Sequence, residues 1–172
     1  MTPTQRSLAY LRDEGYLVAI VEIELTKGLK AIVDSDDVNK INWNKWSANK
    51  SGKCVYAVRC YKKTKQYLHR LIAGAQKGQF VDHINGNTLD NRKKNLRICT
   101  KQENSWNQKK RNNLYKGVTK HKDKFSARLT INGKNLYFGL HETPEEAAKA
   151  YNEAAIKHFG SFARLNNVTD PA

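Results

Sequence analysis

The chain has 172 residues, which is enough for one ordinary domain or two small ones. Its 31 lysines and arginines against 16 aspartates and glutamates give a net charge of +15, and this charge is segregated. Residues 53–81 hold seven basic side chains and no acid, and residues 109–137 hold nine basic side chains and one aspartate. Such segregation favours a polyanion such as nucleic acid. A membrane surface is disfavoured, because no basic helix shows a broad apolar face.

Targeting signals and cysteines bear on the compartment. The sequence shows no secretory signal and no apolar run long enough to span a bilayer, so we expect a protein of the cytoplasm. Its three cysteines, Cys54, Cys60 and Cys99, are odd in number and form no CxxC pair. We therefore expect small buried side chains in a reducing compartment, and neither disulfides nor zinc ligands.

The N-terminal part is predicted to begin with a helix and to continue in strands. Residues 2–15 open with a capping signal and a proline, and Gly15 would end the helix. Apolar and β-branched residues then predict strands over three segments, 16–25, 29–34 and 53–61. Trp43 and Trp46 lie before the third strand, and we interpret them as core anchors in preference to base-stacking platforms.

The middle of the chain is predicted to hold a short helix over 66–78 and a strand with a loop over 79–88. A loop that passes into a helix is predicted over 88–108. A polar, basic stretch follows at 109–114, and we place a domain boundary there. The basic side chains of this linker, Lys109, Lys110 and Arg111, are expected to follow the DNA backbone or to enter the minor groove.

The last third of the chain predicts a small sheet with one apolar face. Three short strand candidates lie within 115–140, and Asn132-Gly133 between the last two is the preferred dipeptide of a two-residue hairpin turn. Alternation places seven residues on the apolar face: Phe125, Ala127, Leu129, Ile131, Leu136, Phe138 and Leu140. The other face would carry Lys124, Ser126, Arg128, Thr130, Asn135 and Tyr137.

A C-terminal helix is predicted with clear boundaries. Thr143 is its cap, Pro144 is its first residue, and Glu146 completes a capping box, while Gly160 ends the helix. Its apolar stripe consists of Ala147, Ala148, Tyr151, Ala154, Ala155 and Phe159. The helix would cover the apolar face of the sheet and leave the basic face open, an arrangement that can lie in a DNA groove.

Residues 80–104, FVDHINGNTLDNRKKNLRICTKQEN, combine an acid, a histidine and several carboxamides. Hydrolysis of a phosphodiester needs a base that deprotonates water and a cation that stabilises the negative charge. His83 suits the base, and Asp82 suits a hard ion such as Mg²⁺. An isolated Asp-His pair means little, so the segment by itself fits a metal-dependent catalytic site or a polar surface loop.

The segment LHRLIAG…VDHINGNTLDNRKKNLRICTKQEN resembles the HNH homing endonucleases of phages and introns, over roughly residues 28–108. The resemblance implies a ββα-metal element that holds one divalent ion, Mg²⁺ with Mn²⁺ as the alternative. It implies Asp82 and Asn104 as metal ligands and His83 as the general base. Asn95, by the same resemblance, would hold the loop and orient the histidine.

Residues 115–165 resemble the AP2 DNA-binding domain, through YKGVTKH, KFSARL and NLYFGLHETPEEAAKAYNEAAIKHFGSFARLN. The resemblance implies a three-stranded sheet that reads the major groove, with the helix behind it. The matched positions on the sheet face are Lys116, Thr119, His121, Arg128, Thr130, Asn135 and Tyr137. Plant members carry mostly arginine and tryptophan at such positions, so their target preference does not carry over to this chain.

These patterns together predict a two-domain α+β protein. A ββα-metal (HNH) nuclease domain at 27–108 and an AP2-like domain at 115–172 would be joined by the linker at 109–114. Residues 1–26 would form a helix-strand extension of unknown role.

The expected function is that of a homing-type endonuclease that acts on double-stranded DNA as a monomer and nicks one strand. No small-molecule substrate is expected, and the protein would be encoded by a phage or mobile element and work in the bacterial cytoplasm. The alternative is a non-catalytic, sequence-specific DNA-binding regulator that retains the HNH fold. An RNA-directed protein ranks last, because clustered exposed aromatic side chains of the stacking kind are missing from the sequence.

Overall fold

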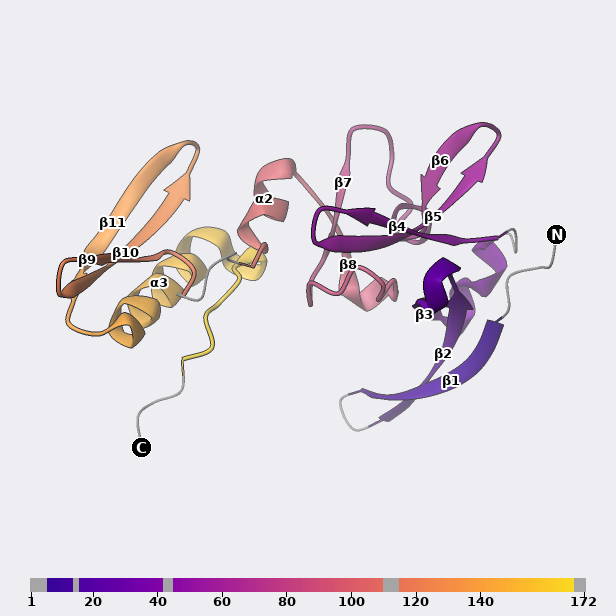
Figure 1. Ribbon diagram of the computed structural model, residues 1–172, viewed down its shortest axis with the longest axis horizontal. Coiled ribbons are helices and arrows are strands. Elements are labelled where there is room, and N and C mark those ends of the chain that lie inside the picture. The colour runs from indigo at the N-terminus through magenta and orange to yellow at the C-terminus, as the bar shows by residue number, and fades with distance from the viewer. Residues whose placement is uncertain (1–5, 14–15, 42–44, 110–114, 169–172) are drawn as a thin grey trace. The chain divides into compact units, whose positions relative to one another are not determined.

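The computed structural model describes residues 6–13, 16–41, 45–109 and 115–168, and it is a mixture of sheets and helices (Figure 1). This mixture is compatible with the α+β class expected from the sequence. The chain divides into two compact units, Met1–Thr100 and Lys101–Ala172. The division falls ahead of the basic linker at which the sequence places a boundary, and each unit is described below by itself.

The first unit opens with an antiparallel sheet of order β1-β2-β3, made of β1 (Arg6–Asp13), β2 (Tyr16–Glu24) and β3 (Lys30–Asp34). The predicted helix over 2–15 is wrong where the structure describes it, because β1 pairs with β2 from Arg6↔Ile23 to Asp13↔Tyr16. Pairing with a β-branched partner strand outweighs the local helix signals. Two 3₁₀ segments, η1 (Thr26–Gly28) and η2 (Ser35–Lys40), flank β3.

A second sheet of the first unit has the order β4-β5-β6 and is followed by a short helix. Its strands are β4 (Ser47–Ser51), β5 (Cys54–Tyr61) and β6 (Thr64–Tyr67), and the helix is α1 (Leu68–Ile72). The helix ends earlier than predicted, just before Gly74 at φ +65°. Cys54 and Cys60 are exposed, so the prediction of burial holds only for Cys99.

The core of the first unit lies between β2, β3 and the second sheet. Its buried residues are Val21, Ile23, Leu25, Ala31, Val33, Ile41, Trp46, Ala57, Leu68 and Ile72. Trp46 is fully buried, which confirms its role as a core anchor, whereas Trp43 lies outside the described residues.

A two-stranded hairpin completes the first unit, with β7 (Phe80–His83) paired to β8 (Leu96–Cys99). The 3₁₀ segment η3 (Lys93–Asn95) comes just before β8. The loop prediction for 88–108 therefore missed a strand, because four residues are too few to show a strand pattern in the sequence.

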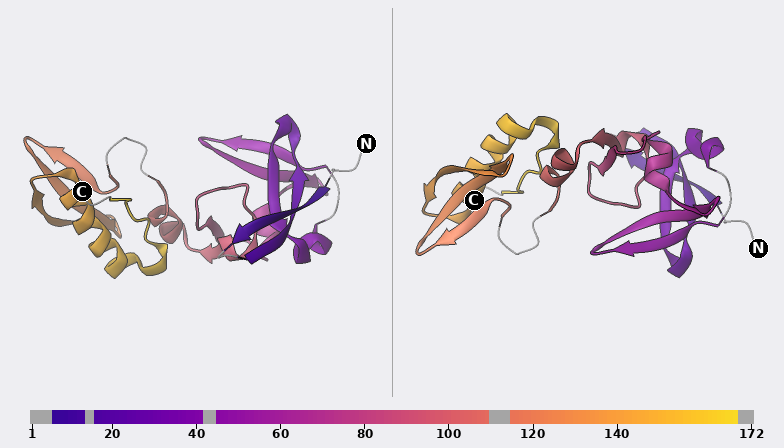
Figure 2. Two further views of the ribbon diagram at one scale, coloured as in Figure 1. Left: turned by 90° about the horizontal axis from the view of Figure 1, so that it is seen from below. Right: turned by 90° about the horizontal axis from the view of Figure 1, so that it is seen from above.

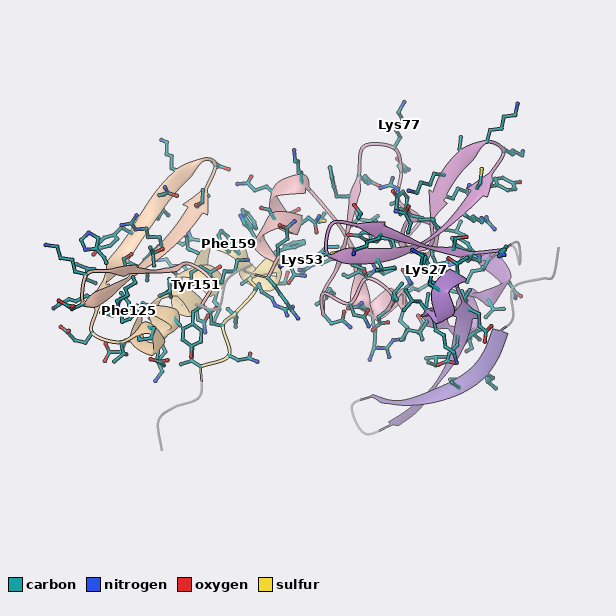
Figure 3. All side chains as sticks on the ribbon, viewed as in Figure 1. Lys27, Lys53, Lys77, Phe125, Tyr151 and Phe159 are labelled. Carbon is teal, nitrogen blue, oxygen red and sulfur yellow. The ribbon has the colours of Figure 1, made fainter. Side chains whose placement is uncertain are left out.

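The second unit contains α2 (Lys101–Trp106), β9 (Val118–His121), β10 (Lys124–Ile131), β11 (Lys134–His141), α3 (Pro144–Phe159) and η4 (Gly160–Phe162). The sheet is antiparallel with the order β11-β10-β9, and α3 covers one face (Figure 2). The capping box, the proline at the start and Gly160 at the end of α3 are all confirmed. So is the apolar stripe, all of which is buried; Tyr151 and Phe159 are labelled in Figure 3.

The faces of this sheet follow the predicted alternation up to a register shift, although Ser126 is buried and Leu136 is 36% exposed. Arg128↔Tyr137 and Thr130↔Asn135 pair directly, so these side chains share the face away from α3. The register of β10 and β11 then shifts between Ser126 and Arg128. Beyond the shift Leu140 pairs with Ser126 and is 49% exposed, so its predicted place on the apolar face is wrong.

Candidate active site and open sheet face

The loop between β7 and β8 is held by β3 and the acidic segment that follows it. Ile32 exchanges backbone hydrogen bonds with this loop, donating to Leu89 O at 2.9 Å and accepting from Asn91 N at 2.8 Å. The Asp34 carboxylate accepts from Lys93 N at 2.8 Å. Asp37, which is fully buried, pairs with the Lys93 ammonium at 2.9 Å. The position of the loop is therefore fixed by residues far upstream in the chain.

Asp82 lies on β7 opposite Arg97 on β8, and it is 5% exposed. Both Nε and Nη2 of Arg97 donate to one carboxylate oxygen, Oδ2, at 2.9 and 2.7 Å. A guanidinium in this geometry compensates a carboxylate that has lost most of its hydration. Arg97 therefore holds the Asp82 side chain in one orientation within the hairpin, a role that the sequence analysis missed.

His83 follows on the same strand and is 6% exposed. Burial lowers the pKa of His83, although the contact with Asn91 and the charges of Asp82 and Asp90 act in the opposite direction. The imidazole is therefore neutral near pH 7, which is the state in which a ring nitrogen accepts a proton.

The tautomer of His83 follows from its neighbour Asn91. Nε2 of His83 lies 3.4 Å from Oδ1 of Asn91, and Nδ2 of the same amide donates to Leu89 O at 3.0 Å. The second hydrogen bond fixes which end of the amide faces the imidazole. An amide oxygen only accepts, so this contact favours the tautomer in which Nε2 of the ring carries the hydrogen. In that tautomer Nδ1 is the basic nitrogen of the ring.

Asn95 holds the loop and does not orient the histidine through its side chain. Its Oδ1 accepts from Asn85 N at 2.9 Å, and its Nδ2 donates to Asp90 O at 2.8 Å. Both polar ends of the amide are therefore used by the loop backbone. The prediction that the Asn95 side chain orients His83 is therefore wrong, because the side-chain amide that contacts the imidazole is that of Asn91.

A buried ion pair supports the same loop from inside. Asp90 is 2% exposed, and Arg92 donates to it through Nε at 2.8 Å and Nη2 at 2.7 Å. Asn85 adds a hydrogen bond from Nδ2 at 2.9 Å. Burial alone would raise the pKa of Asp90, but these donors outweigh it and the pKa is lowered. The carboxylate therefore stays ionised, which keeps this pair intact at neutral pH.

His69 and two tyrosines form an aromatic wall beside His83. The His69 ring is edge-on to the His83 ring at a centroid distance of 5.1 Å, and Tyr56 lies 6.3 Å from His83. Burial, together with the charges of His83 and Arg70, lowers the pKa of His69 to about 3. No described residue hydrogen-bonds to its Nδ1. His69 is therefore neutral, and its described contacts include the rings of Tyr56, Tyr67 and His83.

Asn104 lies on α2, which belongs to the second unit, and it is half-buried. The helix is anchored there through Trp106, which stacks on Phe159 at 4.3 Å and whose carbonyl accepts from the Lys116 ammonium. Gln102 also donates to Asn132 Oδ1 at 2.7 Å. The second predicted metal ligand is thus carried on a helix that packs against the C-terminal fold.

The predicted metal ligands fit a hard cation in their chemistry. Asp82 offers a carboxylate oxygen and Asn104 an amide oxygen, which are ligands that Mg²⁺ accepts. Within the described ranges, no group of three or more histidines, cysteines, aspartates or glutamates lies placed to hold a metal ion. An ion bound by so few protein ligands would keep most of its coordination sphere for water and substrate.

The open face of the C-terminal sheet gathers most of the predicted DNA-binding residues. By register and alternation it carries Thr119, His121, Lys124, Arg128, Thr130, Asn135 and Tyr137, all of them exposed. The Arg128 guanidinium lies 5.9 Å from the Tyr137 ring centroid, and Thr130 donates to Asn135 at 2.7 Å. Lys124 is paired with Glu142 at 2.5 Å.

Lys116 departs from that set, because its ammonium is half-buried against the Trp106 carbonyl. Burial, with the charge of Arg164, lowers the pKa of Lys116 to about 8. Its predicted place on the open sheet face is therefore wrong. Lys109 is exposed, and Lys110 and Arg111 lie outside the described residues.

Comparison with known proteins decides the family of the chain. A family model described as HNH endonuclease matches residues 66–106, which include Asp82, His83, Asn95 and Asn104. An uncharacterized HNH endonuclease of Acanthamoeba polyphaga mimivirus is 36% identical over 149 residues, covering 83% of this chain and 77% of the relative. The chain belongs to the HNH endonuclease family.

Other relatives match parts of the chain. Protein 3.8 of Escherichia phage T7 is 33% identical over 94 residues, or 52% of the chain and 77% of that protein. An AP2-like ethylene-responsive transcription factor of Arabidopsis thaliana is 44% identical over 61 residues, which is 33% of the chain but 10% of the plant protein. No solved structure matches the chain. No helix of the described residues is long and apolar enough to cross a membrane.

Proposed function

We propose that this protein is a homing-type, site-specific DNA endonuclease that hydrolyses phosphodiester bonds with one divalent ion and nicks one strand. The observation that carries the proposal is the state of His83: it is buried, its pKa is lowered, and its Nε2 faces an amide oxygen. A neutral imidazole that is held in place through Nε2 has the protonation state that a general base requires. A residue that served only to pack would need no such arrangement beside an aspartate.

In the proposed mechanism, Nδ1 of His83 accepts a proton from the water that attacks the phosphorus. Asn91 keeps the ring in the required tautomer and orientation through Nε2. Asp82, oriented by Arg97, and Asn104 would hold the ion. When bound, a divalent ion would supply positive charge that stabilises the 3′ oxygen as it leaves.

The proposal is tested by incubating supercoiled plasmid and phage DNA with the protein and Mg²⁺ or Mn²⁺, with EDTA as the control. Conversion to open circles that EDTA prevents is the expected result, since a single nick relaxes the supercoil. Direct conversion to linear DNA would contradict the nicking of one strand but would still show endonuclease activity. Absence of cleavage, with salt-sensitive DNA binding retained, would favour the non-catalytic DNA-binding regulator instead.

The open face of the C-terminal sheet is proposed as the surface that selects the DNA site. Partial similarity to the plant AP2-like proteins and the exposed polar and basic face support this role. Two domains, 27–108 for cleavage and 115–172 for recognition, with the basic linker at 109–114, remain part of the proposal. A monomer would then bring one active site to one asymmetric target.

We expect Arg128→Gln to weaken binding to the preferred DNA by about 5- to 150-fold if this side chain contacts a base. Metal-dependent nicking of non-preferred DNA should persist, because the change leaves the first unit intact. Binding and cleavage of random and selected DNA give the readout. Lys157→Gln on α3 removes one exposed charge from the helix behind the sheet and serves as the control. Equal effects of the two changes would argue against sheet-face recognition.

A further inference from the structure

The turn between β5 and β6 is built from lysines in a conformation that lysine rarely adopts. Tyr61 and Thr64 pair directly, so the turn has two residues, Lys62 and Lys63, with φ of +48° and +62°. Positive φ at both positions is the hairpin geometry that strongly prefers Asn-Gly. The same chain uses Asn132-Gly133 for its β10–β11 turn, with φ of +50° and +75°. The β5–β6 turn therefore keeps two lysines where the backbone favours other residues.

The charge of this hairpin faces outward. Lys62, Lys63 and Lys65 are exposed, and residues 53–81 contain no acid that could pair with them. Arg59 differs, because it is buried with its guanidinium 4.9 Å from the Trp46 ring and 5.2 Å from the Tyr61 ring. In Figure 1 the far end of the hairpin stands out from the other strands of the first unit. The three lysines thus form a projecting basic tip.

One face of the hairpin connects this tip to His83 through aromatic rings. Lys65 shares a face with Tyr67, two residues on, and its ammonium lies 5.2 Å from that ring. Tyr67 is 6.0 Å from Tyr56, which is itself 6.3 Å from His83. DNA bound at His83 would therefore lie beside this face of the β5–β6 hairpin.

We propose that the β5–β6 hairpin binds the phosphate backbone of duplex DNA beside the bond cut at His83, through Lys62, Lys63 and Lys65. The inference rests on the proposed function and adds a contact surface within the first unit. Lysines at a turn act as point charges toward phosphate and carry no base readout. The hairpin strengthens binding to all DNA sequences equally, and the open face of the C-terminal sheet selects among them.

The test replaces Lys62 with asparagine and Lys63 with glycine in the full-length protein, and it measures DNA affinity in EDTA at several salt concentrations. We expect the slope of log K against log salt to flatten by about 1.8, since each lost phosphate contact contributes about 0.9. Affinity at fixed salt should fall by about tenfold or more, equally for preferred and random DNA. Thermal stability should be unchanged or higher, because Asn-Gly suits the turn.

Two further variants keep the result interpretable. The double variant Lys62→Arg/Lys63→Arg keeps both positive charges, so its slope of log K against log salt should match that of the wild type. Lys27→Asn changes another exposed lysine with positive φ (+68°) in the first unit and should leave the slope unchanged (Figure 3).

An unchanged slope in the Asn-Gly variant would overturn the proposal, as would a loss confined to preferred DNA. The binding measurement needs no cleavage. A wild-type protein that fails to cut DNA would therefore refute the nuclease proposal and leave a flattened slope as support for the hairpin contact.

Discussion

Replacing His83 with alanine is expected to lower metal-dependent DNA cleavage by about 10²- to 10⁴-fold while leaving DNA affinity nearly unchanged. The imidazole is buried, and its Nε2 faces the Asn91 amide, so its loss removes the base and no charge that could bind phosphate. Plasmid nicking under single-turnover conditions measures the first effect. Binding of the same DNA in EDTA measures the second.

His69→Phe is the matched control for this experiment. His69 is buried to a similar degree, lies 5.1 Å from the His83 ring, and has no described partner at Nδ1. A phenyl ring keeps the aromatic wall, so the cleavage rate should stay within about tenfold of wild type. Loss of a general base would lower the rate by at least about 10²-fold. If His69→Phe were as inactive as His83→Ala, the assignment of the base would have to be reconsidered. A large loss of DNA binding in His83→Ala would equally contradict it.

Replacing Gly117 with alanine is expected to destabilise the second unit by roughly 3 kcal/mol or more, through overpacking and backbone strain together. Gly117 has φ of +73°, and an added Cβ would lie 1.9 Å from Tyr151 Cδ2 and 2.6 Å from the Arg128 carbonyl oxygen. Tyr151 is 2% exposed, and the Gly117 carbonyl accepts a hydrogen bond from Arg128 N at 2.8 Å. Neither neighbour can move without disturbing the contact between α3 and the sheet.

Gly133→Ala separates the two causes. Its φ of +75° matches that of Gly117, but nothing lies within 4 Å of an added Cβ. Only the backbone penalty of about 1–2 kcal/mol should therefore appear. Urea unfolding of the full-length variants, followed by circular dichroism, gives both values. Equal losses at the two positions would show that the approach of Tyr151 to Gly117 does not constrain the fold.

The C-terminal sheet and helix could be predicted almost completely from the sequence. Their signals are local: Asn132-Gly133 sets a turn, Thr143 and Glu146 set a helix start, and alternation sets the faces. The error at Leu140 has an equally local cause. The register of β10 and β11 shifts in the middle of the strand pair, so residues of β11 beyond the shift lie on the opposite face from the one that alternation predicts. A simple alternating pattern in the sequence does not reveal such a shift.

The N-terminal fold and part of the site depend on contacts that are distant in sequence. β1 is a strand because it pairs with β2, whereas the local sequence of β1 predicts a helix. Asp82 and His83 could be singled out because of their chemistry, and their roles remain proposals. Asn91 could not be distinguished from the neighbouring asparagines by chemistry alone, because only the folded loop brings its amide to the imidazole. Arg97 likewise depends on the pairing of β7 with β8.

The attachment of the loop between β7 and β8 to β3 has a consequence for the order of folding. Asp34 and Lys93 are 59 positions apart, so closing this contact carries a large entropic penalty unless one side is already ordered. The strands β1, β2 and β3 leave the ribosome before the loop does, and their pairings are between neighbouring strands. The surface that receives the loop can thus form first. We therefore expect the loop between β7 and β8 to dock late onto a finished sheet, after the N-terminal part of a nascent chain has folded.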